Sequence, residues 1–403
     1  MTFCLFIGLA YVSALVPTVF LLPRLGLGRR VWLIVSSAFF LVASRFLVSY
    51  LLTGSFSRPP WPGPVVLTWA FLDSTLMAFF LLQLPAYLFF RRLTLRRRRI
   101  VAVVLAIAAP CITAAGFFVS MRPPCVNEIT LEFSDLPAAF DGYRIAQLSD
   151  LHCSPITSRE RFEKIVRMVN SAKPDLVCLT GDCMDGWLCN LGQKLEPLAG
   201  LSAADGVLAV TGNHEYYWCW DEWRTFFESL GIRFLDNAWT NIVRGTESIT
   251  IAGMPDRCAI GPTRRDEDGR RSPDLEARYR YPEHSAAFAG APDGFRILLF
   301  HRPLDMQFAA RDYGVRLQLS GHTHGGAYPG LGLLVGRMND GFVRGLYGEP
   351  GGPFLYVSPG IGQAGCYPLR LFNPSEITVF TLKKALPASF QTTQTALCPV
   401  DSR

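Results

Sequence analysis

Five of the six histidines in this 403-residue chain lie where a short hydrophobic run ends and a polar or glycine-rich turn begins. They are His152, His214, His301, His322 and His324. Asp150, Asp182 and Asn213 occupy the same kind of position. Imidazole, carboxylate and amide oxygen groups that converge in this way are typical ligands of a catalytic metal ion.

The spacing of these residues predicts a site with two metal ions. Side chains two residues apart point to the same side of an extended segment, so we expect Asp150 and His152 to face the site together, as do His322 and His324. A catalytic zinc ion uses about three protein ligands, so seven candidate ligands are too many for one ion. Two divalent ions about 3.5–4 Å apart that share one carboxylate use them all. Because no thiolate is included, the set suits Mn²⁺, Fe or Zn²⁺, with manganese preferred.

A predicted layered α/β domain positions these turns. Between residues 143 and 230, short β-type runs alternate with helical patterns at 159–171, 191–203 and 221–230. The loops at strand ends form the ligand crevice of open α/β sheets. After residue 231 the pattern is mostly β, interrupted by a charged loop at 256–293 in which His284 is not expected to bind metal. A glycine precedes three of the candidate ligands and is expected to permit a tight turn: Gly181, Gly212 and Gly321.

Five ordered motifs in this region resemble the calcineurin-like metallophosphoesterase family, in particular its bacterial membrane-associated branch. They are D-x-H at 150–152, G-D-x-x-D at 181–185, G-N-H-E at 212–215, the lone His301 and G-H-T-H-G-G at 321–326. The segment at 354–382 also resembles the closing part of that branch. The chain departs from the branch at Ala327, where glutamine is common, and at Pro359, where arginine is frequent. The resemblance covers roughly residues 126–385 and implies a four-layer α-β-β-α sandwich.

The resemblance also implies a role for each candidate residue. The implied ligands are Asp150, His152 and His324 for one metal and Asn213, His301 and His322 for the other, with Asp182 shared. His214 binds no metal and lies near the phosphate, where it stabilises charge and protonates the leaving oxygen. We expect in-line attack by a hydroxide that the two cations activate. Asp185 is expected to brace its loop, and Glu215 to orient the ligands.

The first 121 residues differ chemically from the rest. They contain eleven arginines and one acid, Asp73, and carry a charge of +10, whereas the other 282 residues carry −4. Four segments approach the ~20 apolar residues that cross a bilayer: 2–22, 31–52, 65–90 and 100–121. The arginine-rich loops 23–30 and 91–99 are cytoplasmic by the positive-inside rule. We therefore predict a multi-pass plasma or inner membrane protein whose domain 122–386 and C-terminal tail 387–403 lie on the non-cytoplasmic side.

Two charged residues lie within the predicted spans. Arg45 and Asp73 have similar depths, so they form a buried ion pair, or else Arg45 extends alone toward the outer surface. The run RRRR at 96–99 is flanked by apolar segments, which indicates membrane topology and no nucleic-acid partner. None of the eleven cysteines forms a C-x-x-C pair, so the disulfide pairing stays open.

These features together predict an integral membrane phosphoesterase. Its expected substrate is a phosphate ester or pyrophosphate bond in a cell-envelope lipid or glycan, since anchoring raises the local concentration of such molecules. The alternatives are a phosphodiesterase or phosphatase for soluble substrates, a UDP-diacylglucosamine-type hydrolase if the domain is cytosolic, and a non-catalytic scaffold. The aromatic residues at 216–223 pack in the core, line a groove for a lipid or glycan part of the substrate, or rest on the membrane interface.

Overall fold

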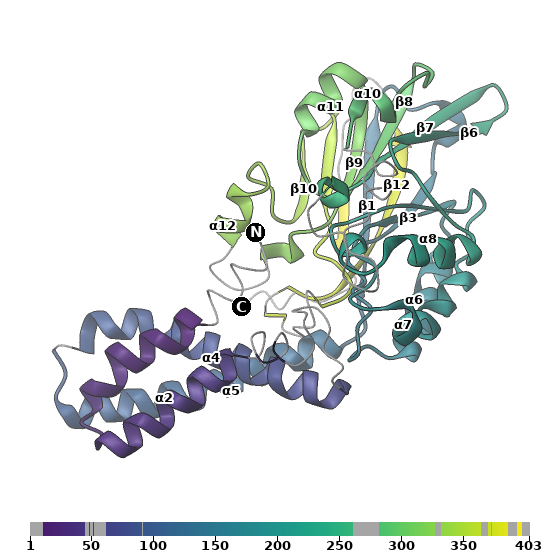
Figure 1. Cartoon of the computed structure of the whole chain (residues 1–403). Coiled ribbons are helices and arrows are strands. Elements are labelled where there is room, and N and C mark those ends of the chain that lie inside the picture. The colour runs from purple at the N-terminus through teal and green to yellow at the C-terminus, as the bar shows by residue number, and fades with distance from the viewer. Residues whose placement is uncertain are drawn as a thin grey trace. The chain divides into compact units, whose positions relative to one another are not determined.

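The computed structural model describes residues 11–44, 48, 51, 62–90, 92–260, 282–326, 332–363, 370–371, 373–385 and 393–396. The chain divides into two compact units. Residues 1–121 with 366–369 form the first, here named the helical unit, and residues 122–365 with 370–403 form the second, here named the two-sheet unit. Figure 1 shows the helices of the first and the strands and surrounding helices of the second.

The helical unit is built from strongly hydrophobic helices. Its elements are η1 (Pro17–Leu21), η2 (Leu22–Leu25), α2 (Arg29–Ala43), α4 (Gly63–Phe90) and α5 (Leu95–Met121). Within the described residues, the segments Gly63–Ala86 and Leu95–Met121 are long and apolar enough to cross a bilayer. The first two predicted spans lie partly outside the described residues, as does Arg45, so its pairing with the buried Asp73 stays a prediction.

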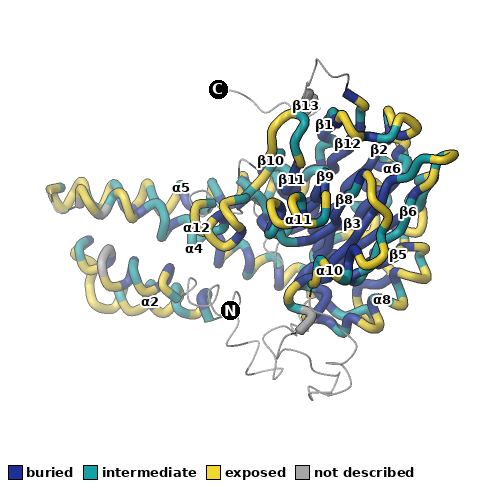
Figure 2. The backbone as a smooth tube through the Cα atoms, turned by 90° about the horizontal axis from the view of Figure 1, so that it is seen from above, coloured by how far each residue is buried: buried dark blue, intermediate teal, exposed yellow. Residues whose placement is uncertain are grey.

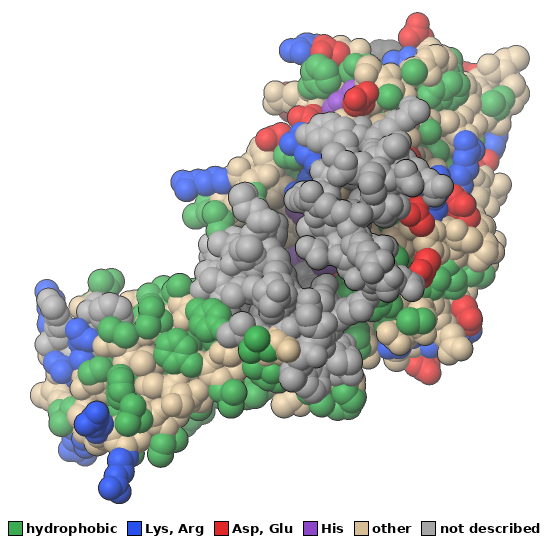
Figure 3. Space-filling model, viewed as in Figure 1, with side chains coloured by type: hydrophobic (Ala, Val, Ile, Leu, Met, Phe, Trp, Pro, Cys, Tyr) green, Lys and Arg blue, Asp and Glu red, His purple; other side chains and the backbone are tan. Residues whose placement is uncertain are grey.

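The two arginine-rich loops meet at one end of the helical unit. Arg99 donates a hydrogen bond from Nε to the carbonyl of Leu25 (2.9 Å) and another from Nη2 to the carbonyl of Gly26 (3.2 Å). Figure 3 shows arginine side chains gathered toward this end and hydrophobic side chains along the flanks of the helices. The arginines of the two loops are therefore concentrated at one end of the helical unit.

The first sheet of the two-sheet unit has seven strands in the order β13-β1-β12-β2-β3-β4-β5. Their bounds are β1 (Cys125–Phe133), β2 (Arg144–Leu148), β3 (Leu176–Thr180), β4 (Val207–Val210), β5 (Ile232–Phe234), β12 (Glu376–Lys384) and β13 (Thr393–Ala396). The connecting helices include η3 (Ala138–Phe140), α6 (Arg159–Ser171), α7 (Leu188–Leu195), η4 (Glu196–Gly200), η5 (His214–Tyr217) and α8 (Trp220–Ser229). Strands β2 to β5 are parallel, so their carboxyl ends meet at the same edge of the sheet.

The second sheet has six strands in the order β10-β11-β9-β8-β7-β6. Their bounds are β6 (Ala238–Arg244), β7 (Glu247–Met254), β8 (Phe295–Phe300), β9 (Val315–Ser320), β10 (Gly345–Tyr347) and β11 (Phe354–Val357). The helices of this half are η6 (Arg257–Ile260), α10 (His284–Ala287), α11 (Met306–Tyr313), η7 (His324–Gly326) and α12 (Gly332–Arg337). Strands β7, β8, β9 and β11 are parallel neighbours.

Side-chain alternation along the strands creates three apolar cores in the two-sheet unit. In β3, Val177 and Leu179 pack in the core with α6, α7 and α8, whereas Leu176 and Cys178 pack between the two sheets. Strand β8 divides its side chains between the inter-sheet core and a third core that includes residues of α10 and α11. Figure 2 accordingly shows buried residues along the strands of both sheets and exposed residues mainly on helices and loop tips. The result is a mixed α/β fold with helices outside two packed sheets.

The sequence patterns predicted some elements and missed others. The amphipathic pattern at 159–171 forms α6 with the same bounds. The helix predicted at 191–203 becomes α7 followed by the 3-10 helix η4, because Pro197 has no N–H to continue α-helical bonding. The pattern also missed α11, whose eight residues are too short for a clear period. Within the predicted tail at 387–403, residues 393–396 pair with β1 as strand β13.

Candidate metal centre

The candidate ligands from both sheets converge at the carboxyl ends of parallel strands. Asp150 and His152 follow β2, Asp182 follows β3 and Asn213 with His214 follows β4, whereas His301 follows β8 and both His322 and His324 follow β9. Hydrogen bonds join these turns both within the first sheet and between the two sheets. The N–H of Asp150 donates to the carbonyl of Gly181 (2.9 Å), and the N–H of His322 donates to Oδ1 of Asp150 (3.1 Å). The two sheets therefore build one site.

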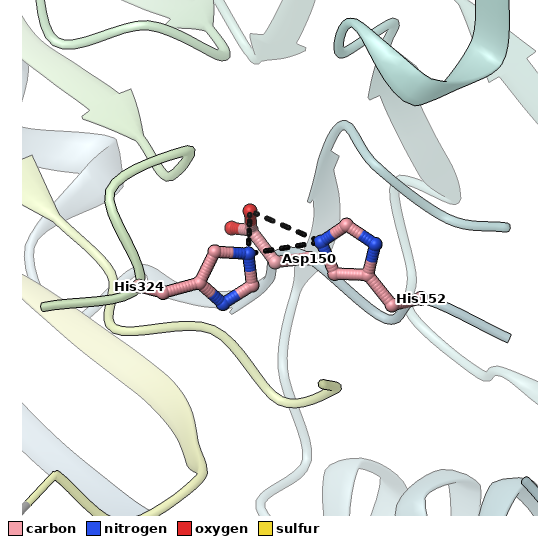
Figure 4. Close-up of side chains that lie close together, drawn as sticks. All are labelled: Asp150, His152 and His324. Carbon is pink, nitrogen blue, oxygen red and sulfur yellow. Dashed lines mark hydrogen bonds and ion pairs between the residues drawn. The ribbon is translucent and has the colours of Figure 1, made fainter. Parts of the chain in front are cut away.

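One group of potential metal ligands consists of Asp150, His152 and His324. The Nε2 atoms of the two histidines are 2.9 Å apart, and Oδ1 of Asp150 lies 3.3 Å from Nε2 of His324 and 3.8 Å from Nε2 of His152 (Figure 4). Ligand atoms about 2.1 Å from one ion in tetrahedral geometry are about 3.4 Å apart. The three side chains are therefore spaced as ligands of one ion.

A second group consists of Asp182, His301 and His322. Nδ1 of His301 donates to the carbonyl of Thr180 (2.7 Å), which fixes the tautomer and directs Nε2 inward. Nε2 lies 3.2 Å from Oδ2 of Asp182, yet within the described chain neither it nor Oδ1 of Asn213 makes a hydrogen bond, although both atoms are buried. Buried polar atoms are normally satisfied, so these two fit a bound cation.

Asp182 lies between the two groups. Its Oδ2 atom is 3.7 Å from Nε2 of His152 in the first group and 3.2 Å from Nε2 of His301 in the second. Its Oδ1 atom accepts the backbone N–H of His214 (2.8 Å). Asp182 therefore belongs to the second group and also lies close to a histidine of the first group. Among the described acidic residues, it alone combines these two properties. The donor set as a whole fits a divalent metal centre.

The convergence arises from left-handed turns, not from extended segments. Asp150 and His152 have φ values of 53° and 41°, and His322 and His324 have φ values of 70° and 48°. The expectation that each pair shares the side of an extended strand was wrong, because β2 and β9 end at Leu148 and Ser320. Residues other than glycine rarely adopt positive φ, and such strain concentrates at functional sites.

Two carboxylates outside these two groups hold the site together, and one of them, Asp185, forms a third possible group with His152 and His214. Asp185 contacts Nδ1 of His152 (3.0 Å) through Oδ2 and Nδ1 of His214 through Oδ1. Glu215 is buried and accepts the backbone N–H groups of Gly212 (2.7 Å), Asp182 (3.0 Å) and Cys183 (2.6 Å). Asp185 therefore does more than brace its loop, because it orients both a potential ligand and the catalytic candidate.

Burial and neighbouring charges set the ionisation of the site. Burial alone would raise the pKa of Asp182, but the positive charges of His301 and His214 outweigh it and hold that pKa well below its usual range. Burial likewise opposes charge on the two histidines, yet Asp182 raises the pKa of His301 to about 10, and Asp185 with Asp182 raises the pKa of His214 to about 10. Burial and nearby cations lower the pKa of His322 well below its usual value. Asp182 as a carboxylate and His322 as a neutral imidazole are therefore in the forms that bind metal, whereas His301 would release its proton to a bound cation.

The closing segment of the two-sheet unit supports the turn at His324. The guanidinium of Arg370 is buried and donates to the carbonyls of Pro359 (3.1 Å) and Gly362 (3.1 Å). The side-chain amide of Asn373 donates to the carbonyl of His324. The motifs did not predict these contacts, although the resemblance at 354–382 marked the segment. Ala327, one of the two departures, lies outside the described residues.

The remaining candidates lie around the centre or away from it. Tyr216, Trp218, Trp220 and Trp223 are buried in the core, so packing explains them, whereas Tyr217 is 37% exposed beside the ring of His214. His284 packs against Phe308 and Tyr313 and belongs to neither ligand group.

Comparisons with known proteins agree with this geometry. Residues 143–326 match the model of the calcineurin-like phosphoesterase family. The chain is 34% identical over 294 residues to a Danio rerio "Transmembrane protein with metallophosphoesterase domain", an alignment that covers 70% of this chain and 63% of that protein. It is 32% identical to an "Uncharacterized metallophosphoesterase" of Aquifex aeolicus (64% of this chain, 91% of the relative) and 31% identical to the "Uncharacterized metallophosphoesterase YkuE" of Bacillus subtilis (72% and 97%). With the metal-ligand geometry and these relatives together, the chain belongs to the calcineurin-like metallophosphoesterase family.

Proposed function

We propose that the chain is a membrane-anchored phosphoesterase with two divalent ions, and that it acts on a phosphorylated lipid or glycan of the cell envelope. The observation that carries the two-ion centre is the pair of buried, unsatisfied atoms, Nε2 of His301 and Oδ1 of Asn213, beside a carboxylate shared with the first ligand group. Buried polar atoms are normally hydrogen-bonded, and a bound cation would satisfy both of these.

The proposed ligands divide into two sets around Asp182. Asp150, His152 and His324 hold one ion, and Asn213, His301 and His322 hold the other. When bound, the two cations supply the positive charge that polarises the phosphoryl oxygens and activates a water molecule for attack. Manganese is the preferred metal, because carboxylate and amide oxygens accompany the imidazoles.

His214 is the proposed general acid. Asp185 holds its Nδ1 atom, and its Nε2 atom lies 3.9 Å from Oδ2 of Asp182, so this nitrogen faces the centre. The side chain is 21% exposed, which leaves room for a substrate oxygen. Since the pKa of His214 is raised to about 10, the ring carries a proton at neutral pH that it can donate to the leaving oxygen.

Three observations support a membrane location with the site on the non-cytoplasmic side. Two helices have the length and hydrophobicity of bilayer spans, and we propose that residues 2–22 and 31–52 complete a set of four. The arginine-rich loops lie at one end of the helical unit. Cys125 is disulfide-bonded, which is typical of oxidising compartments. A catalytic domain so anchored meets substrates at the bilayer at high local concentration.

The direct test uses the full chain purified in detergent. The protein is loaded with manganese, iron or zinc, its metal content is measured, and turnover is compared on aryl phosphate monoesters, aryl phosphate diesters and lipid phosphates. We expect two ions per chain, turnover, and faster turnover of lipid phosphates. Turnover without any gain on lipid substrates would favour the soluble-substrate alternative.

Topology requires a separate measurement. A reporter fused after Met121 is expected to report a non-cytoplasmic location. A cytosolic signal would contradict the orientation and would favour a UDP-diacylglucosamine-type substrate, which is available on that side.

A further inference from the structure

Arg302 is a partly buried cation beside the metal centre, and none of the roles proposed above includes it. It follows His301 directly, and 20% of its side chain is exposed. Asp256 is fully buried and accepts hydrogen bonds from Nε (2.6 Å) and Nη2 (3.2 Å) of Arg302. Asp256 is itself fixed, because its N–H donates to Oγ1 of Thr211 (3.2 Å) and its Oδ1 accepts the N–H of Cys258 (2.8 Å). The guanidinium is therefore held in one orientation.

The third guanidinium nitrogen contacts one of the proposed metal ligands. Nη1 lies 3.1 Å from Nε2 of His322, and among the described residues this is its one hydrogen-bonding contact. A guanidinium nitrogen of this kind carries two N–H groups and accepts no hydrogen bond. One N–H group of Nη1 is therefore available to a ligand that enters the centre.

A fixed cation in this position opposes the binding of metal cations. Asp256 compensates one positive charge, but it lies on the side of the guanidinium away from Nη1. An anion that binds the metals would remove the conflict, because its oxygens would accept from Nη1. Guanidinium groups are well suited to phosphate oxygens, with which they form strong charge-assisted hydrogen bonds.

We infer that Arg302 binds an anionic oxygen of the substrate phosphate, and that the centre consequently favours a phosphomonoester, or the terminal phosphate of a diphosphate, over a phosphodiester. This inference rests on the proposed function. A phosphodiester has two non-bridging oxygens, which two bound cations would occupy. A phosphomonoester, or the terminal phosphate of a diphosphate, has a third non-bridging oxygen, to which Arg302 could donate a hydrogen bond.

The first test measures binding of inorganic phosphate to the metal-loaded full chain by calorimetry. Arg302→Met is expected to weaken phosphate binding roughly 10- to 100-fold, the usual effect of losing a charge-assisted hydrogen bond. Arg302→Lys keeps the positive charge but loses the planar guanidinium that Asp256 holds in place. We therefore expect a smaller loss of phosphate affinity than for Arg302→Met. The matched control is Arg311→Met, which removes an exposed arginine that pairs with its neighbour Asp312. The control is expected to bind phosphate like the unmodified chain.

The second test compares an aryl phosphate monoester with the corresponding diester. Arg302→Met is expected to lower kcat/KM for the monoester by at least tenfold more than for the diester, with unchanged metal content. Equal losses on both esters, or unchanged phosphate affinity in both Arg302 variants, would overturn the inference. A fall in metal content with phosphate affinity retained would also overturn it, because Arg302 would then only support His322. If the unmodified chain bound no metal or hydrolysed no phosphoester, the proposed function itself would fail instead.

Discussion

Substitution of Gly181 by alanine tests whether the end of β3 fixes the second ligand group. The φ angle of Gly181 is +87°, and a Cβ atom there would lie 2.7 Å from Nδ1 of His301 and 2.5 Å from the backbone nitrogen of Gly212. Ordinary contacts of a Cβ atom begin at 3.4 Å, so the ring of His301 must move by about 0.7 Å or the backbone of Gly212 by about 0.9 Å. Either shift displaces a ligand-bearing turn.

Gly206 provides a matched control at the start of the neighbouring strand. Its φ angle is +82°, and nothing lies within 4 Å of the position of a Cβ atom. Both alanine variants carry the left-handed backbone penalty of roughly 1–2 kcal/mol. Gly181→Ala adds the cost of overpacking, about 1–3 kcal/mol. The difference between the two variants therefore isolates the contact with His301 and Gly212.

Two measurements follow from this comparison. Thermal unfolding of the metal-free proteins is expected to place Gly181→Ala several degrees below Gly206→Ala, at about 2–4 °C for each kcal/mol. Metal analysis is expected to give two ions for Gly206→Ala and, for Gly181→Ala, loss of the ion that His301 holds. Equal Tm values and equal metal content in the two variants would refute the reasoning.

Three further predictions concern the carboxylates. Asp182→Ala is expected to abolish binding of both ions, measured as metal per chain; loss of only one would show that Asp182 is not shared. Asp185→Asn is expected to lower kcat by about 10²–10⁴, because His214 loses its orienting partner. In the metal-free chain the raised pKa of His214 stabilises the fold fully below pH 6.5, and this contribution disappears as the pH rises through about 10. The variant should show a shallower slope of Tm between pH 6.5 and 10, and the pKa of His214 measured by NMR should fall below about 10; an unchanged titration would contradict the assignment. Glu215→Gln is expected to destabilise the fold by about 1–3 kcal/mol in urea unfolding, because an amide donor would face backbone N–H groups; an unchanged midpoint would exclude this bracing role.

The sequence by itself determined which groups reach the centre. The residue types in five ordered motifs specify oxygen and nitrogen donors, and their positions after hydrophobic runs specify strand ends. The amphipathic pattern of α6 was readable because its buried face depends on local spacing. Hydrophobic length similarly indicated the apolar helices of the first 121 residues.

The tertiary structure alone decided how those groups meet. Asp185 contacts two histidines, and Arg302 donates to Asp256, although these residues are far apart in the chain. The turns that bring Asp150 and His322 together are left-handed. Periodicity reports only which face of an element is apolar, so it carries no information about such partners. Likewise β13 exists because β1 offers an edge to pair with, and nothing in residues 393–396 specifies that edge.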